Sequence, residues 1–285
     1  MMRKASLTLI ALTMLLSACT GGAAKSTAGS NAASSTPMVT ASTAPTNTTS
    51  PASTATAAPS PSPEPSPAGK EVAKTYHMNK IYDIVPNDSS GNKKVVLLTF
   101  DDGPKEKEMN ESLIATLKKH KASAIFFLNG YRIKQKPEIL KLLNDSGMTI
   151  GNHSWDHIDL KKVDNPKVDQ QVGDVQKIVK DLTGSAPQFF RPPFGLGSSY
   201  LREKVSSEHM LYMTWSNGSK DWEMTNAKNE PAKVVENVLS QLHPGSNILM
   251  HELPWTVSVL DELLTKLEEK GYSFVDPRSI ELEAR

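Results

Sequence analysis

Two adjacent carboxylates, Asp101 and Asp102, follow directly after an apolar stretch of the chain. The stretch at 95–98 (Val-Val-Leu-Leu) predicts a strand that is buried on both faces. Carboxylates at the end of a buried strand repel each other and resist desolvation, and a cation is the simplest compensation. The same residues, followed by Gly-Pro, also favour a solvated polar turn. By itself the segment therefore indicates either a turn or a metal or acid/base site.

Two histidines, His153 and His157, form a second group. At this spacing they lie on one face of a helical turn, and both imidazoles can reach one metal ion. They follow a predicted strand at 148–151, which places them at the same end of the sheet as the carboxylates. One carboxylate and two histidines make a ligand set for a catalytic divalent metal, with positions open for water and substrate. A solvated helix face is the alternative for such a pair in isolation.

Two further polar segments also follow predicted strands. Arg191 begins the segment Arg-Pro-Pro-Phe-Gly, in which the prolines fix the backbone and the guanidinium brings a permanent positive charge. The second segment is 215–222, in which Asp221 can orient a partner side chain. Trp215 and Trp222 offer aromatic surfaces that suit a sugar ring, and core packing is the alternative for both.

His251 ends a buried strand at 248–251. Alone it would be interpreted as a structural histidine. As a further polar group at the same edge of the sheet, it becomes a candidate general acid. The other histidines fall in a linker, at helix ends or in a loop and are interpreted as structural or solvated: His77, His120, His209 and His243.

The elements that must position these residues alternate between strands and helices. Apolar runs predict seven strands, at 95–99, 124–129, 148–151, 188–191, 211–215, 248–251 and 273–275. Between them, helices are predicted at 107–119, 136–146, 167–182, 198–208, 231–242 and 256–270. This alternation predicts an α/β fold with parallel strands and right-handed crossovers, either doubly wound or a barrel. Polar residues after so many strands favour a (β/α) TIM-like barrel of about seven parallel strands.

The N-terminus has the pattern of a targeting segment. Arg3 and Lys4 precede an apolar run at 7–16 that is too short to cross a bilayer permanently. The run leads through small residues to Cys19, the only cysteine of the chain. It resembles a bacterial lipoprotein signal peptide at 1–18, with lipidation of Cys19, and an ordinary signal peptide is the alternative. We expect an extracytoplasmic protein held at the cell membrane by its N-terminal lipid, because two or more acyl chains give stable attachment.

Composition divides the remainder into a tether and one domain. Residues 19–70 consist almost entirely of Ser, Thr, Ala, Pro, Gly and Asn, which cannot bury enough apolar surface to fold, so a disordered tether is expected. Residues 71–285 are long enough for one domain with a substantial core. The net charge of +1 argues against nucleic acid or another polyanion as a partner. A single cysteine leaves no disulfide or thiolate metal site within the chain.

Five segments, in order, resemble those of the polysaccharide deacetylases, the carbohydrate esterase family with the NodB homology domain. They are 99–104 (Thr-Phe-Asp-Asp-Gly-Pro), the pair His153 and His157, 191–195 (Arg-Pro-Pro-Phe-Gly), Asp221-Trp222 and 249–251 (Leu-Met-His). The resemblance covers about 95–275. It implies a distorted (β/α) barrel, a divalent metal that is commonly zinc, and hydrolysis of N- or O-acetyl groups on polysaccharides.

The resemblance also implies a role for each matched residue. The metal ligands are Asp102, His153 and His157. The general base is Asp101, which Arg191 positions, and the general acid is His251, with Asp221 holding either His251 or Arg191. Substrate contacts are expected from Phe194, Trp222 and Leu249, and a backbone N–H near Phe194 is expected to stabilise the oxyanion.

Two positions depart from the family pattern. Gly218 stands where an aspartate is common, three residues before Asp221, and a sub-group that acts on muramic acid also varies there. Glu252 stands where an aspartate is frequent. The function predicted is N-deacetylation of cell-wall peptidoglycan at N-acetylglucosamine. The alternatives are a deacetylase for N-acetylmuramic acid or for another polysaccharide such as a chitin-like glycan, and a non-catalytic wall-binding lipoprotein.

Overall fold

The structure is a computed structural model that describes residues 72–284. The predicted signal peptide, the lipidation site Cys19 and the tether at 19–70 lie outside the described residues. Within 72–284, none of the helices is both long and apolar enough to cross a membrane.

A sheet of parallel strands forms the centre of the domain. Seven strands hydrogen-bond in the order β7–β6–β5–β4–β3–β9–β8. They are β3 (Val95–Gly103), β4 (Ala124–Leu128), β5 (Thr149–Asn152), β6 (Phe189–Phe190), β7 (Leu211–Tyr212), β8 (Asn217–Gly218) and β9 (Ser246–His251). Every neighbouring pair is parallel. The predicted distorted barrel of about seven parallel strands is confirmed.

The distortion lies between the two outer strands of this order. The chain passes directly from β7 to β8, and between them its backbone hydrogen-bonds first to β6 and then to β9. The N–H of Met213 donates to the carbonyl of Phe190, and the N–H of Ser216 donates to the carbonyl of Asn247. A few residues of irregular chain thus stand where further strand pairing would close a regular barrel.

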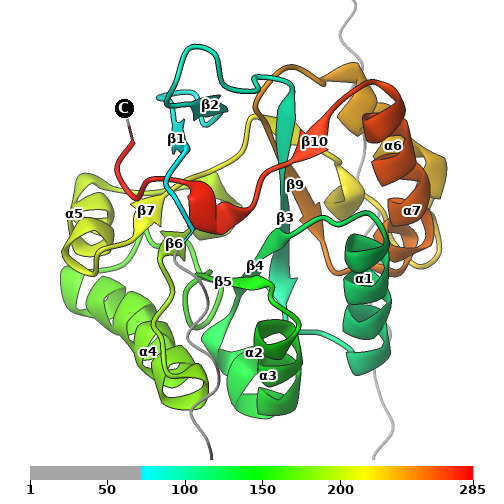
Figure 1. Cartoon of the computed structure of the whole chain (residues 1–285). Coiled ribbons are helices and arrows are strands. Elements are labelled where there is room, and N and C mark those ends of the chain that lie inside the picture. The colour runs from blue at the N-terminus through cyan, green and yellow to red at the C-terminus, as the bar shows by residue number, and fades with distance from the viewer. Residues whose placement is uncertain (1–71, 285) are drawn as a thin grey trace, which may run out of the picture. The chain divides into compact units, whose positions relative to one another are not determined.

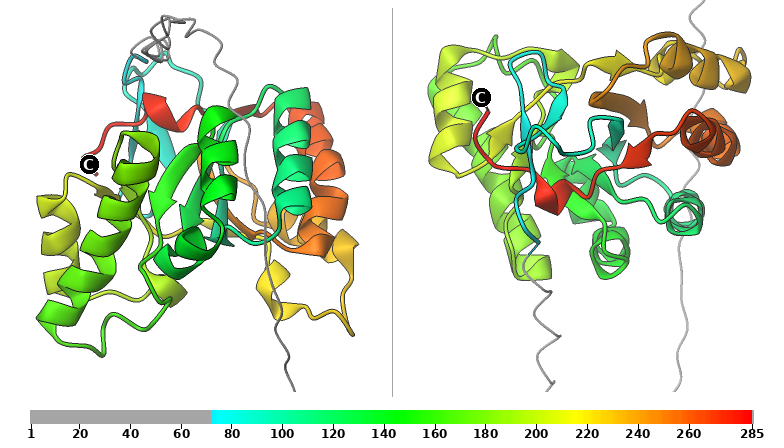
Figure 2. Two further views of the ribbon diagram at one scale, coloured as in Figure 1. Left: turned by 90° about the horizontal axis from the view of Figure 1, so that it is seen from below. Right: turned by 45° about the horizontal axis from the view of Figure 1, so that its top comes forward.

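Helices cover the outer face of the sheet (Figure 1). They are α1 (Lys107–Lys119), α2 (Gly130–Gln135), α3 (Pro137–Asp145), α4 (Asn165–Thr183), α5 (Ser199–Ser207), α6 (Pro231–Ser240) and α7 (Pro254–Glu269). Figure 2 shows them in a row, and the contacts between neighbours give the order α5, α4, α3, α1, α7 and α6. Each helix buries one apolar stripe against the sheet, as α7 does with Val259, Leu260, Leu263, Leu264 and Leu267.

Strand residues alternate between two apolar cores. In β3, Val96 and Leu98 pack in the core beneath the helices, whereas Val95 and Leu97 pack in a second core inside the curved sheet. The hairpin of β1 (Tyr76–Met78) and β2 (Ile84–Pro86) joins the inner core through buried Met78 and Ile84. The same alternation directs the side chains of Thr99 and Asp101, further along β3, toward the inner side.

The predicted helices all occur, with ends within two residues of the expected ones, whereas the strands are partly corrected. The run at 273–275 forms β10 (Ser273–Phe274), which is not one of the seven ordered strands. It pairs with the start of β3, on the side of β3 that faces away from β9. Val96 shows this, since it is paired with Phe274 on one side and with Ser246 on the other. The seventh place belongs to β8, whose Asn-Gly sequence has no apolar run to mark it. The hairpin β1–β2 and helix α2 were also not predicted.

Candidate metal centre and active site

Asp101 and Asp102 both reach the site because β3 is irregular at its carboxyl end. Consecutive residues of a regular strand point to opposite faces. Here the register between β3 and β4 shifts between Asp101 and Gly103, and Asp102 has a φ of 66°. A left-handed backbone is uncommon for a residue other than glycine. It belongs to a bulge that turns the Asp102 carboxylate toward the same site as Asp101.

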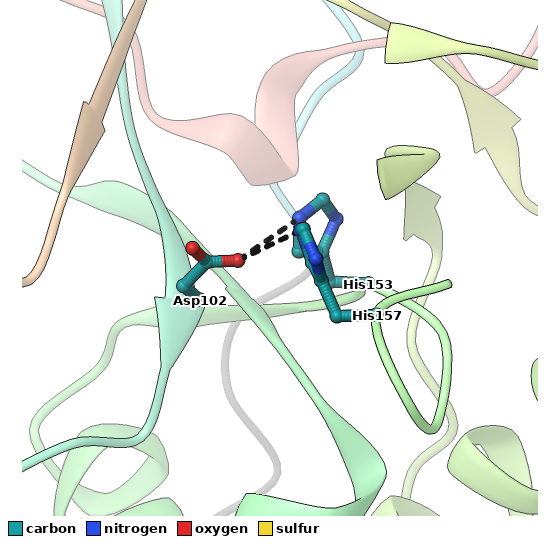
Figure 3. Close-up of side chains that lie close together, drawn as sticks. All are labelled: Asp102, His153 and His157. Carbon is teal, nitrogen blue, oxygen red and sulfur yellow. Dashed lines mark ion pairs between the residues drawn. The ribbon is translucent and has the colours of Figure 1, made fainter. Parts of the chain in front are cut away.

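His153 and His157 converge on Asp102 (Figure 3). Their Nε2 atoms lie 3.4 and 3.1 Å from Asp102 Oδ1. The predicted helical turn is wrong, because residues 153–157 form a loop with φ values of 65° at Ser154 and 52° at His157. The side chain of Asn152 supports this loop by accepting the Ser154 N–H at 2.9 Å. The two imidazoles therefore meet through the path of the loop rather than through helical spacing.

These three side chains fit a divalent metal. Asp102 Oδ1 and the two Nε2 atoms all lie within 4.8 Å of one another. His153 Nδ1 lies 2.6 Å from the carbonyl oxygen of Arg191, which can only accept, so Nδ1 donates there and Nε2 is the ring nitrogen that faces Asp102. Burial raises the pKa of the Asp102 carboxyl, but the interactions with His153 and His157 outweigh burial and hold it well below its usual range. An ionised carboxylate and imidazole nitrogens are ligands that suit zinc and similar ions.

Asp101 is fixed by a buried cation. Its Oδ1 accepts a hydrogen bond from Arg191 Nη1 at 2.8 Å, and the two side chains are 4% and 0% exposed. Its Oδ2 lies on the side of the metal ligands, 3.8 Å from His153 Nε2. One carboxylate oxygen is thus held in place while the other faces the candidate metal centre.

Arg191 is itself held at the irregular junction between β7 and β8. Nη1 donates to Thr99 Oγ1 at 2.7 Å, while Nε and Nη2 donate to the carbonyl of Thr214 at 3.1 and 2.7 Å. Nη2 also donates to Asn247 Oδ1 at 3.1 Å, and the guanidinium lies 4.4 Å from the centre of the Phe127 ring. Sequence analysis missed Thr99 and Asn247. The signal that could have found Thr99 is a polar residue within an otherwise apolar predicted strand, whereas Asn247 precedes the strand predicted at 248–251.

Asp221 holds His251, and not Arg191. Asp221 Oδ1 lies 2.8 Å from His251 Nδ1, and Oδ2 accepts the backbone N–H of His251 at 2.7 Å. The Thr256 hydroxyl donates to the same Oδ2 at 2.7 Å, and the Trp255 indole donates to the Asp221 carbonyl at 2.9 Å. Burial lowers the pKa of His251, but the hydrogen bond to Asp221 and the surrounding carboxylates outweigh burial and raise it above its ordinary value. The hydrogen bond to Asp221 therefore favours the protonated form of the imidazole.

The expected metal ligands, acid/base groups and substrate contacts line one cavity of about 410 Å³, whereas Arg191 and Asp221 are buried behind it. The polar lining consists of Asp101, Asp102, His153, His157 and His251, and the apolar lining includes Phe194, Trp215, Trp222 and Leu249. Phe194 is 60% exposed and Trp222 is 42% exposed. Large exposed rings at the mouth of a cavity offer apolar faces to a sugar. Core packing therefore does not describe Trp222.

The aromatic rings also contact the histidines. Phe194 stands edge-on to His157, with ring centroids 4.8 Å apart, and Trp222 stands edge-on to His251 at 5.6 Å. Gly218 lies beside both tryptophans, since a Cβ added there would be 3.2 Å from Trp222 and 3.6 Å from Trp215 Nε1. A larger side chain at this position would require the indoles to shift. The departure at Gly218 thus shapes the aromatic wall of the cavity.

Comparisons with known proteins agree with this geometry. A protein-family model described as polysaccharide deacetylase matches residues 88–220. The chain is 34% identical to a peptidoglycan-N-acetylmuramic acid deacetylase, PdaC of Bacillus subtilis, over 67% of this chain and 39% of the relative. It is also 34% identical to a peptidoglycan-N-acetylglucosamine deacetylase of Bacillus cereus, over 65% of this chain and 67% of the relative.

Among solved structures, the chain resembles BA3943 of Bacillus anthracis, which is a pseudoenzyme of carbohydrate esterase family 4. A mutant of that protein with restored enzymatic activity is 31% identical, with a TM-score of 0.61 over 64% of this chain and 65% of the other. Among the relatives, the chain spans 39% of the length of PdaC and 67% of the Bacillus cereus protein. The match to the family model includes β3 to β8 and ends before Asp221 and β9.

Proposed function

This chain belongs to the polysaccharide deacetylase family, and from this premise we propose that it is a metal-dependent hydrolase of N-acetyl groups on cell-wall polysaccharide. We propose the N-acetylglucosamine of peptidoglycan as its substrate. One observation carries the proposal: a ligand set for a divalent metal lies in the same cavity as two independently fixed acid/base groups. Asp101 is fixed by buried Arg191, and His251 is fixed by buried Asp221.

The proposed chemistry divides between the metal and the side chains. Asp102, His153 and His157 would hold the ion, for which zinc is our expectation, and a bound ion supplies a Lewis acid for the acetyl carbonyl and for water. Asp101 Oδ2 accepts the proton of the attacking water while Oδ1 stays on Arg191. His251 Nε2 donates a proton to the leaving amine, because an amine leaves poorly unless it is protonated.

The sugar is proposed from the cavity lining and the relatives. Phe194, Trp222 and Leu249 give apolar contact surface beside the acid/base groups, and the backbone N–H of Phe194 is proposed to stabilise the oxyanion. N-Acetylmuramic acid is the second candidate, because PdaC is a peptidoglycan-N-acetylmuramic acid deacetylase and Gly218 alters the aromatic wall. The similarity to a pseudoenzyme keeps a wall-binding function as a distinct alternative.

Acetate release tests the proposed function. The purified protein would be loaded with zinc and incubated with peptidoglycan and with acetylated glucosamine oligosaccharides, and the deacetylated sugar would be identified by mass spectrometry. We expect metal-dependent acetate release with free amines on glucosamine. Free amines on muramic acid alone would favour the second candidate. Glycan binding with no acetate release from any substrate would favour the wall-binding alternative.

His251→Ala tests the role proposed for the general acid. Because acid catalysis assists departure of a poor leaving group, we expect acetate release from an amide to fall by about 10²- to 10⁴-fold. The loss should be much smaller on an activated acetyl ester, whose leaving group needs no proton. Rates on both substrates, measured at equal metal occupancy, check this. Equal losses on both would assign His251 a structural or binding role instead.

The proposed location is the outer side of a bacterial membrane, with attachment through a lipid on Cys19. The lipoprotein-like sequence that ends at Cys19 supports this proposal, since double acylation gives stable anchoring. Cys19→Ala should therefore release the protein from the membrane fraction or block its processing. Fractionation followed by immunoblotting measures this. A variant that is processed and sediments with membranes as the wild type does would contradict lipidation.

A further inference from the structure

Glu252 is a buried carboxylate that the proposed chemistry does not use. It follows His251 at the end of β9, and the two side chains point in different directions. His251 lines the cavity, whereas Glu252 is fully buried and is absent from the cavity lining. A buried carboxylate is costly unless it is hydrogen-bonded. The contacts of Glu252 therefore indicate what its burial achieves.

One oxygen of Glu252 holds the segment that follows Asp102. Oε2 accepts the backbone N–H of Lys105 at 2.8 Å and the side-chain amide of Asn110 at 2.7 Å. Oε1 is buried without a hydrogen-bond partner among residues 72–284. It lies against Gly103, where an added Cβ would overlap it. The carboxylate thus sits directly on the backbone of residues 103–105.

This backbone is continuous with the irregular conformation of Asp102. A left-handed residue other than glycine persists only where its surroundings hold it. On one side, the carbonyl of Gly103 accepts the N–H of Asn129 at 2.8 Å. On the other side, the hydrogen bond from Lys105 to Glu252 ties the segment to the end of β9. Without that bond, β9 holds this part of β3 through the pairing of Asp101 with His251, which ends before Asp102.

We propose that Glu252 is a positioning residue for the metal centre. Through the N–H of Lys105, it holds Asp102 in the orientation that binds the ion, and it links this ligand to the strand that carries His251. The inference rests on the metal site of the proposed function. It also gives a physical reason for glutamate in place of the family's frequent aspartate, since the longer side chain reaches across Gly103 to Lys105.

A simple charge-balancing role is the competing explanation. Burial raises the pKa of the Glu252 carboxyl, and the positive charges of Lys105 and Arg132 act against that rise. Two conservative variants separate the effect of the charge from that of the side-chain length. Glu252→Gln keeps the length and an acceptor oxygen for Lys105 but removes the charge. Glu252→Asp keeps the charge but shortens the side chain, so that it no longer reaches Lys105.

The test is the zinc dissociation constant of the metal-stripped full-length protein, measured by competition with a chromophoric chelator. Loss of groups that orient metal ligands typically weakens affinity by about 10- to 100-fold. We expect a loss of about that size for Glu252→Ala and Glu252→Asp, and one below about tenfold for Glu252→Gln. Wild-type affinity in the alanine and aspartate variants would overturn the proposal. Weakened binding in the glutamine variant with wild-type affinity in the aspartate variant would also overturn it, in favour of charge balance.

Thr256→Val is a matched control. Thr256 is equally buried and follows the same strand, but its hydroxyl bonds Asp221 on the side of His251. Its zinc affinity should equal that of the wild type. Thermal unfolding of the metal-free proteins shows which variants are native, and the aspartate and glutamine variants decide the question if the alanine variant does not fold. A wild type that binds no zinc would overturn the proposed function itself, whereas unchanged variants of a zinc-binding wild type overturn only the role of Glu252.

Discussion

Replacing Asp101 by asparagine is expected to lower acetate release by about 10²- to 10⁴-fold, the usual contribution of a general base, while the metal remains bound. The asparagine carbonyl can still accept the hydrogen bond that Arg191 Nη1 gives to Oδ1 at 2.8 Å. The oxygen that faces the metal ligands, however, is replaced by an amide group that cannot accept a proton. Asp101 is not one of the three side chains whose ligand atoms cluster together. Metal content and activity should therefore separate in this variant.

Two measurements make the result interpretable. Removing the charge of Asp101 leaves Arg191 as a buried cation without its carboxylate, and this is destabilising. Circular dichroism and thermal unfolding must therefore establish that the variant is folded at the assay temperature. Elemental analysis must show the same metal content as in the wild type. A folded, metal-loaded Asp101→Asn protein with activity within tenfold of the wild type would assign the base to another group.

The proximity of the site residues could be predicted, because it depends on the direction of the strands. Parallel strands present their carboxyl ends at one edge, so polar residues after the runs at 95–99, 148–151 and 248–251 must be near one another. The lengths of the apolar stripes were equally informative, since each of the six predicted helices occurs within two residues of its predicted ends, although α2 was not predicted. Strand direction and apolar stripes are signalled by patterns that repeat along the sequence, so a single exceptional residue does not change the prediction.

The orientation of individual ligands could not be predicted, because it depends on single residues that break the pattern. The bulge at Asp102 and the left-handed residues Ser154 and His157 interrupt regular structure where two distant segments meet. The two histidines do lie together, but the helical spacing on which the prediction rested is not the reason. The role of Asp221 also remained open, since the choice between Arg191 and His251 requires the path of the chain between β7 and β8.

Glu252 is another residue whose role could not be predicted from the sequence. The resemblance to the family marks it as a departure, but its meaning depends on Lys105, which is 147 positions away in the chain. Contacts of this kind carry no periodic signal. They are nevertheless the contacts that fix a strained residue such as Asp102, and the residues that position a site are therefore harder to predict than those that form it.

Removing either proposed histidine ligand should abolish most metal binding and, with it, acetate release. Loss of a group that only orients a ligand costs about 10- to 100-fold in affinity, and loss of a ligand should cost at least as much. His153 is nearly fully buried and is oriented by the carbonyl of Arg191. His157 is about one quarter exposed, and its ring packs against Phe194. His157→Ala is therefore the variant less prone to disturb the fold, and we expect it to lose bound metal while it unfolds at nearly the wild-type temperature.

His77→Ala provides the matched control, because His77 lies on β1 and bonds Asn87 at 2.7 Å, away from the metal ligands. Zinc content after dialysis against a weak chelator should be near wild type in this control and close to zero in His153→Ala and His157→Ala. Activity should follow metal content across the series, because Asp101 and His251 remain in place in all three variants. Full zinc occupancy in His157→Ala would remove His157 from the ligand set. The carboxylate of Asp102 and His153 would then require a third ligand from elsewhere in the cavity, and Asp101, whose Oδ2 is 3.8 Å from His153 Nε2, would be the nearest carboxylate to supply it.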